Sequence, residues 1–327
     1  MVHTLNLNLV KKIYFNALRI RKIENTIAQK YIQNQMRCPI HLSVGQELIA
    51  ASVCAFLTKS DYVVSSHRSH AHYLSKGGSL NKMIAELYGK VTGCSLGRGG
   101  SMHLIDLDVN FMGATAIVGN TIPIGVGIGE AISLKEENSI SVIFLGDGAT
   151  EEGVFYESVN YAAVRNIPVL FVCENNDFSV YTNKNPRQSL KRENFRLVAE
   201  FGISSQVISD FDMNSLDEIQ LAIETVKRTR KPSFLEIKTF RVLEHCGPNN
   251  DDHLGYRTES EIKKGLLSDP LNQLEEFLVK ADKNFESERS LELTKIDSEI
   301  ESAFVFAENS PFPETINSVS DVFKAKV

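Results

Sequence analysis

Apolar residues along the chain follow two patterns, short continuous runs and longer segments with helical spacing. The runs are rich in Val, Ile and Phe, which favours strands covered on both faces in a parallel sheet. They lie at 62–65 (YVVS), 140–145 (ISVIFL), 168–174 (PVLFVCE) and 233–239 (SFLEIKT). Segments with apolar residues at helical spacing lie at 8–36, 44–57, from Thr121 onward, from near Glu151 and at 213–229.

Strands and helices therefore alternate along most of the chain, which predicts an α/β fold with a doubly wound, mostly parallel sheet flanked by helices. We find no internal repeat and no linker, so we expect a single domain over 1–327. It includes an N-terminal helix at 8–36 and a helical C-terminal extension at 259–327. The glycine-dense segment 89–129 keeps its apolar residues, which indicates an ordered loop that ends in a helix.

Composition narrows the class of partner. The formal net charge of the 327 residues is −6 and no basic block is long enough to follow a phosphate backbone, so we expect no nucleic acid. No run approaches the roughly 20 apolar residues that span a bilayer, so we expect no membrane. The five cysteines are scattered without a C-x-x-C pair, so the sequence indicates neither a disulfide framework nor a zinc cluster. We therefore expect a cytoplasmic location, where thiols stay reduced.

The first candidate for chemistry is Asp147, which stands between Gly146 and Gly148 at the end of the run 140–145. Glycines allow a sharp turn and a close approach to a ligand, and open α/β sheets bind ligands at the carboxyl ends of their strands. A lone GDG more often marks an ordinary turn from strand to helix. However, Asn176 follows the next predicted strand, and one strand–helix–strand unit would set the two side chains side by side. A carboxylate and an amide oxygen suit Mg²⁺ that also binds substrate phosphates.

This stretch resembles the thiamin-diphosphate motif, GDG followed about 30 residues later by NN, in the alpha subunits of 2-oxo acid dehydrogenase complexes of the pyruvate, branched-chain and acetoin types. Further blocks of that family occur in the same order from about residue 9 to about 270, so we expect no transit peptide within this sequence. They are HLSVGQE (41–47), HRSHAHYLSKG (67–77), GRGGSMHL (97–104), IVGNTIPIGVGIG (117–129) and HLGYRTESEI (253–262).

The resemblance implies two cofactors, thiamin diphosphate and Mg²⁺, and a role for each matching residue. Metal ligands would be the Asp147 and Asn176 side chains and the carbonyl of Phe178. The diphosphate would lie on Gly146, Gly148 and Ala149 and pair with Arg68. Backbone groups of Ala116 and Val118 would face the aminopyrimidine. His245 and His41 would be the catalytic histidines, with His245 in a mobile loop (241–257) over the thiazolium.

The chain departs from the family pattern on the substrate side. His67 precedes the diphosphate arginine where the family often has an aromatic residue, and it would line the cofactor site. Cys246 replaces the regulatory serine of pyruvate-type members, which excludes phosphoserine control there. Glu151 and Glu152 stand where the family often has a neutral residue, and we expect them to complement a helix dipole. For His70, His72 and His103, a place at the edge of the site and a structural role remain equally open.

The resemblance also implies partners. In this family the glutamate that activates the cofactor comes from a beta subunit, so we expect an α₂β₂ heterotetramer with a small 2-oxo acid as substrate. A lipoyl-bearing acyltransferase is a further candidate partner. Two alternatives stay open at this point. One is the N-terminal half of a split transketolase, and the other is a non-catalytic scaffold that retains the cofactor fold.

Overall fold

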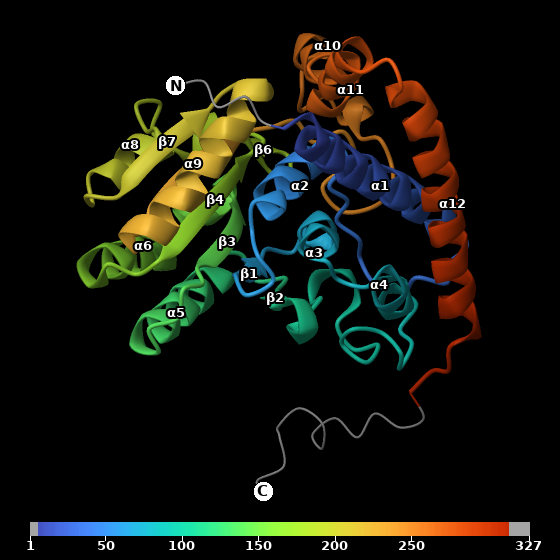
Figure 1. Cartoon of the computed structure of the whole chain (residues 1–327), viewed down its shortest axis with the longest axis horizontal. Helices are drawn as coiled ribbons and strands as arrows, with labels where there is room; N and C mark the ends of the chain where they lie inside the picture. Colours follow the sequence, from blue (N-terminus) through green and yellow to red (C-terminus); the bar gives the residue numbers. More distant parts are fainter. Residues whose placement is uncertain (1–5, 314–327) are drawn as a thin grey trace, which may run out of the picture.

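The computed structural model describes residues 6–313 and is built on one six-stranded sheet, with strand order β2-β1-β3-β4-β8-β7 (Figure 1). Every neighbouring pair in it is parallel, as predicted. The strands are β1 (Tyr62–Ser65), β2 (Phe111–Ala114), β3 (Ser141–Gly146), β4 (Val169–Asn175), β7 (Ser204–Ile208) and β8 (Ser233–Lys238). A separate antiparallel ribbon pairs β5 (Phe178–Ser179) with β6 (Thr182–Asn183).

Helices cover both faces of the sheet. The bounds of the longer helices are α1 (Leu7–Tyr31), α2 (Glu47–Ala55), α4 (Leu80–Leu87), α5 (Thr121–Leu134), α6 (Gly153–Arg165), α9 (Met213–Thr229), α10 (Glu259–Leu267), α11 (Pro270–Ala281) and α12 (Phe285–Asn309). The shorter ones are α3 (His70–Lys76), α7 (Lys184–Arg187) and α8 (Asn194–Ala199). Strands β2 and β7 were not predicted, because both are short and β2 lies inside the glycine-dense segment.

The two-residue period of the strands divides the core into two layers. In β3, Val142 and Phe144 join the apolar cluster that includes α1, α2, α4, α9 and α12. Ile143 and Leu145 join the cluster formed with α5, α6 and α8 on the other face. Both sets are buried, which is why this strand is a continuous apolar run instead of an alternating one.

Helix α5 packs closely on the sheet through two glycines. A Cβ atom at Gly125 would lie 2.3 Å from Cγ1 of Ile143, and one at Gly129 would lie 2.5 Å from Cγ2 of Ile167. Neither distance is physically possible, so any side chain there would push the helix off the sheet. These two glycines therefore face the core and not a partner protein, whereas Ile124 between them is 47% exposed.

The N-terminal helix ends earlier than the predicted 8–36, because the chain turns after Tyr31 and Asn34 adopts a left-handed φ of 56°. Its apolar stripe packs against α2, α11 and α12. The predicted C-terminal extension contains α10, α11 and α12, and its last part, 314–327, lies outside the described residues. Figure 1 shows α12 running along the edge of the molecule beside α1 and α4. No described helix combines the length and the apolar character needed to cross a bilayer.

The strand order brings the predicted ligand-binding loops together. From β1 the chain continues to β2 on one side, whereas β3 lies on the other side of β1. Where connections diverge in this way, the loops after the two strands separate and leave a crevice at their carboxyl ends. The loops that follow β1, β3 and β4 carry His67, Asp147 and Asn176, so the topology alone places these residues around one crevice.

A buried carboxylate organises the glycine-rich loop of the GRGG block. The Glu86 side chain, at the end of α4, is 1% exposed. It accepts hydrogen bonds of 2.7–3.1 Å from the backbone N–H groups of Ser95, Gly97, Gly99 and Gly100. Gly97 has a left-handed φ of 75°, and a Cβ at Gly93 would lie 2.3 Å from the Glu86 Oε2 atom. The loop is glycine-rich because its backbone wraps tightly around this anion.

We predict that Glu86→Gln lowers the free energy of unfolding by about 2–3 kcal/mol, because an amide NH₂ would face backbone donors that now share a charged acceptor. Urea denaturation of the two proteins measures the difference. Glu301→Gln, at an exposed position of α12, is the matched control and should stay within about 0.5 kcal/mol of the parent. Equal stabilities for Glu86→Gln and the control would contradict this role of Glu86.

Candidate active site

A cavity opens at the carboxyl ends of β1, β3 and β4, where the topology predicts it. Most of the predicted site residues line it, namely His67, Arg68, Val118, Gly146, Asp147, Gly148, Ala149, Asn176, Phe178 and His245. Ala116 and His41 are not among the lining residues. His41 lies just behind the wall, with its ring centroid 4.7 Å from that of His67.

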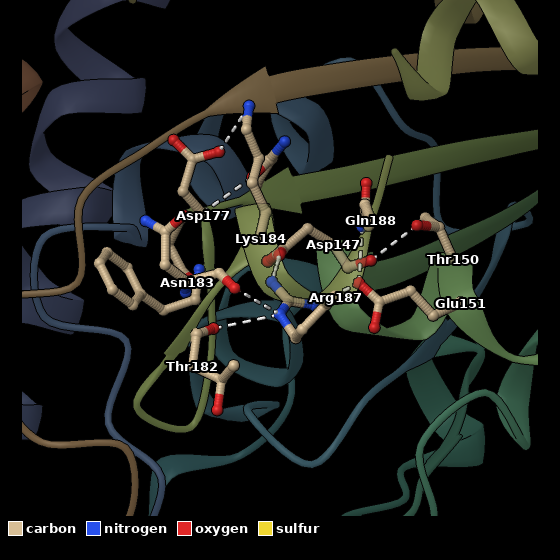
Figure 2. Close-up of polar contacts among 12 residues, drawn as sticks. Asp147, Thr150, Glu151, Asp177, Thr182, Asn183, Lys184, Arg187 and Gln188 are labelled. Carbon is tan, nitrogen blue, oxygen red and sulfur yellow. Dashed lines mark hydrogen bonds and ion pairs between the residues drawn. The ribbon is translucent and has the colours of Figure 1, made fainter. Parts of the chain in front are cut away.

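Asp147 is 3% exposed and bonds to a residue that the sequence did not single out (Figure 2). Its Oδ2 atom lies 2.7 Å from Nη2 of Arg187, at the end of the short helix α7. Burial raises the pKa of Asp147 to about 6, and Arg187 opposes that rise through its hydrogen bond and its charge. The carboxylate at this strand end therefore depends on a neighbouring cation to remain ionised.

Glu151 has a different role from the one predicted. The segment Asp147–Glu151 is a 3₁₀ turn, and the α-helix α6 begins only at Gly153. The Glu151 side chain pairs with Nη1 of Arg187 and accepts a 2.6 Å hydrogen bond from Nε2 of Gln188. It is therefore a counter-ion of Arg187.

Asn176 and Phe178 meet at the end of β4. The Asn176 Oδ1 atom accepts a 3.1 Å hydrogen bond from the backbone N–H of Phe178, and its Nδ2 group donates to Oε1 of Gln46 at 2.9 Å. The amide is thus oriented with its oxygen toward the turn that follows the strand. Gln46 fixes this orientation from the loop before α2, a contact across 130 residues of sequence.

The floor of the cavity is backbone. A Cβ atom at Gly146 would meet no atom within 4 Å, so the chain is open to the cavity there. A Cβ at Gly148 would lie 3.1 Å from Oγ of Ser179 and 3.6 Å from Nη1 of Arg187. The two glycines thus expose main-chain atoms beside the Asp147 carboxylate, as a diphosphate-binding turn requires.

Three imidazoles gather at the other end of the cavity. The ring centroids of His41, His67 and His245 are 4.7–5.3 Å apart, and one nitrogen of each lies within 4.8 Å of the others. Burial, followed by neighbouring histidines and the Arg68 guanidinium, lowers the pKa of His41 to about 2. Burial and Arg68 lower the pKa of His67 to about 4 and that of His245 to about 3. All three rings are therefore neutral at pH 7.

Arg68 lies beneath these rings and is 5% exposed. Its Nη1 donates to the carbonyl of Leu42, and its Nη2 lies 3.0 Å from the carbonyl oxygen of His245. Burial and the nearby Arg241 charge lower the pKa of Arg68 to about 10, so it stays a cation. A buried cation without an anionic partner is unfavourable, and an anion in the cavity would relieve that cost.

The loop 241–257 carries His245 and is tied down by a network that the sequence did not reveal. Arg257 donates to Asp251 and Asp252 at 2.7 Å, and Tyr256 donates to Asp251 at 2.8 Å. Arg241 donates to the Tyr256 hydroxyl at 2.8 Å, and its Nη1 lies 3.4 Å from Nδ1 of His245. The pair Asp251–Asp252 thus serves to hold the loop.

The remaining histidines divide between wall and edge. The Nδ1 atom of His70 lies 3.3 Å from Glu24, and Nε2 lies 2.8 Å from Oγ of Ser101, in a buried contact between α3 and α1. His72 bonds to Glu174, which lines the cavity, and stacks on Phe144 with centroids 3.9 Å apart. His103 is exposed after the glycine-rich loop. His70 is thus structural in this arrangement, whereas His72 lies behind the cavity wall.

Sequence analysis missed four residues that shape the site: Gln46, Glu174, Arg187 and Arg241. Gln46 lies within the HLSVGQE block and Glu174 ends a predicted strand, so both stood next to recognised signals. Arg187 and Arg241 had no such signal. Both lie in polar loops. Arg187 contacts Asp147 across 40 residues of sequence, and Arg241 contacts His245 only once the loop that carries both has folded.

Comparison with known proteins places the chain in a family. A model of the dehydrogenase E1 component matches residues 16–316. A pyruvate dehydrogenase E1 component subunit alpha from Rickettsia bellii is 34% identical over 305 residues, which cover 92% of each chain. The alpha subunit of an acetoin:2,6-dichlorophenolindophenol oxidoreductase from Bacillus subtilis is 33% identical over 95% of this chain and 92% of its own length.

A chloroplastic relative shows the same level of similarity. The pyruvate dehydrogenase E1 component subunit alpha-3 of Arabidopsis thaliana is 33% identical over 95% of this chain and 74% of its own length. Together these matches cover the blocks at 41–47, 67–77 and 117–129 and the GDG turn, and they confirm the resemblance and the enzyme class, a dehydrogenase component, that the motifs predicted. The chain belongs to the dehydrogenase E1 component family.

Proposed function

We propose that this chain is the alpha subunit of a thiamin-diphosphate- and Mg²⁺-dependent 2-oxo acid dehydrogenase. One observation carries the proposal. A buried carboxylate (Asp147) and an oriented amide (Asn176) lie at neighbouring strand ends, around a cavity that also holds a buried cation (Arg68) and neutral imidazoles. That set of groups matches a metal-bound diphosphate at one end and a carbonyl substrate at the other. The family assignment supports it.

The residues present fit both groups. The Asp147 carboxylate, the Asn176 amide oxygen and the Phe178 carbonyl would hold Mg²⁺, because all three are hard oxygen donors and Mg²⁺ takes its remaining ligands from phosphates and water. Arg68 would pair with the diphosphate, which would supply the anion that its guanidinium lacks. Gly146, Gly148 and Ala149 would line the diphosphate, and backbone groups of Ala116 and Val118 would face the aminopyrimidine.

When bound, thiamin diphosphate supplies a carbanion for addition to a carbonyl and an electron sink for the loss of carbon dioxide. The chain would contribute His245 and His41 as hydrogen-bonding groups at the substrate carbonyl. A neutral imidazole can donate one proton and accept another, so His245 would move a proton without carrying charge beforehand. The imidazole of His67 would make this end of the cavity more polar than a carbocyclic aromatic ring would. A polar lining suits a small 2-oxo acid or a related carbonyl compound.

A second chain would complete the site. Apolar side chains remain exposed on α5, on α6 and on the loop before α5, namely Ile117, Val118, Ile124, Leu134, Tyr161 and Val164. Such a concentration is typical of a protein interface. We therefore propose that a beta subunit covers this face, supplies the activating glutamate and forms an α₂β₂ heterotetramer. A lipoyl-bearing acyltransferase would receive the acyl group.

Two further proposals concern the chain as a whole. We propose that it is a single domain, because one apolar cluster includes residues of α1, the sheet and α12. We also propose a cytoplasmic location, which suits five cysteines that all remain free in the structure.

The first test is cofactor linkage. Mg²⁺ and thiamin diphosphate together should stabilise the assembled protein more than either alone. At a hundred times the dissociation constant, the stabilisation relative to the ligand-free protein should be about 2.7 kcal/mol. Asp147→Ala should abolish this stabilisation, because the amide and carbonyl ligands alone cannot hold the ion. Differential scanning calorimetry with each ligand, both and neither gives the comparison. An undiminished melting shift in Asp147→Ala would refute the metal assignment.

The second test separates catalysis from binding. His245→Ala should lower turnover about a hundredfold, the usual contribution of a positioned acid–base group, with a much smaller loss in cofactor affinity. Steady-state decarboxylation and calorimetric titration measure the two quantities. His253→Ala, at an exposed position of the same loop, is the matched control. If His245→Ala loses affinity and turnover equally, the residue binds cofactor and is not catalytic.

The third test concerns the second chain. Thiamin-dependent decarboxylation should be absent from the purified chain and appear when a candidate beta subunit is added. Ile124→Glu should weaken the assembly, because it puts a charge on the exposed apolar face of α5. Leu291→Glu, an exposed apolar position on α12, should assemble as the parent does. Analytical ultracentrifugation measures assembly, and full activity from the chain alone would refute the split site.

A further inference from the structure

Arg187 occupies the cation position at the predicted metal ligand. Its guanidinium donates to Asp147 through Nη2 and to Glu151 through Nη1, so one side chain bridges the two carboxylates that flank the Gly148 floor (Figure 2). The Arg187 side chain is 11% exposed and that of Asp147 is 4% exposed. The contact is therefore a largely buried ion pair and not a surface one.

The segment that carries Arg187 is built to hold it there. The Arg187 Nε atom donates to the carbonyls of Thr182 and Asn183 at 3.1 and 3.2 Å, which fixes the guanidinium against the β5–β6 ribbon. Asp177, at the base of that ribbon, pairs with Lys184 and Lys238 at 3.2 and 3.0 Å. All five N–H groups of an arginine form a rigid fork, and here the fork meets two carboxylates and two carbonyls in a fixed orientation.

Arg187 and a metal ion would share the Asp147 carboxylate. A divalent ion that binds Asp147 must approach the carboxylate oxygens, and Oδ2 is the atom that Arg187 holds at 2.7 Å. The guanidinium also reaches over the diphosphate floor, because Nη1 would lie 3.6 Å from a Cβ at Gly148. Like charges repel, so Arg187 in this arrangement would oppose the binding of Mg²⁺ at Asp147.

We propose that Arg187 is a built-in counter-ion that holds the metal site of the cofactor-free chain and must leave Asp147 before Mg²⁺ binds. This inference rests on the proposed function. After Arg187 has left Asp147, its guanidinium would keep Glu151 as its counter-ion. This role would explain an acidic residue at position 151. The pair prevents a buried, uncompensated carboxylate before loading, and it sets the metal affinity, because only molecules with Asp147 released are competent to bind.

The test compares Arg187→Met with the parent, each assembled with a candidate beta subunit. Without ligands, Arg187→Met should melt at a lower temperature, because Asp147 loses its partner. At saturating thiamin diphosphate, its apparent affinity for Mg²⁺ should rise about tenfold, as expected if only about a tenth of the parent molecules are competent. Isothermal titration calorimetry with MgCl₂ gives the affinity, so activity is not needed as the readout.

Two further variants keep the result interpretable. Arg187→Lys retains the charge but cannot bridge both carboxylates, so its Mg²⁺ affinity should fall between those of the parent and Arg187→Met. Arg192→Met is the matched control, since Arg192 bonds to the Thr150 carbonyl and hydroxyl of the same turn without touching Asp147. Its Mg²⁺ affinity should equal that of the parent.

The outcomes separate the two proposals. If the parent assembly binds neither Mg²⁺ nor thiamin diphosphate, the proposed function is wrong. If the parent binds both and Arg187→Met binds Mg²⁺ more weakly, Arg187 is a diphosphate ligand and the counter-ion inference is overturned. A lower melting temperature with unchanged affinity also overturns it, because Arg187 would then be purely structural.

Discussion

The site depends on one costly arrangement, a carboxylate buried at the end of β3. Asp147 is 3% exposed, and burial raises its pKa to about 6. Such a group must have a cation beside it to stay ionised near pH 7. The structure supplies Arg187, and the proposed enzyme would replace it with Mg²⁺. In this proposal, the folding of the loop after β4 and the binding of the metal ion would be linked through the same carboxylate.

The rest of the cavity follows a similar electrostatic pattern with the signs reversed. Arg68 and Arg241 are buried near the histidines, and burial of His245 together with these two charges and His67 lowers the pKa of His245 to about 3. The proposed diphosphate would neutralise the charge of Arg68. Arg241 already forms an ion pair with Asp251 and donates a hydrogen bond to the Tyr256 hydroxyl. Among the described residues, Arg241 thus has a carboxylate within ion-pair distance, whereas no ion pair to Arg68 is seen. This difference supports the proposal that Arg241 holds the loop and that Arg68 would bind an anion.

Membership of the family and the departures from its pattern also fit together. Glu151 differs from the neutral residue that the family often carries, and its partner is Arg187. His67 stands where the family often has a different aromatic residue, and its ring lies beside two other imidazoles at the proposed substrate end. The first change concerns the metal end of the cavity and the second the carbonyl end. The two departures thus lie at opposite ends of the cavity.

The sequence by itself determined the sheet and the residues at its strand ends. Continuous apolar runs identified β1, β3, β4 and β8, because both faces of these strands are buried and apolar residues therefore do not alternate with polar ones. The GDG turn and Asn176 followed directly from those runs. Only the tertiary structure decided how loops far apart in sequence neutralise one another, as Arg187 does for Asp147. Such pairs leave no periodic signal in the sequence, since a polar loop residue acquires its partner only when the backbone on both sides has folded.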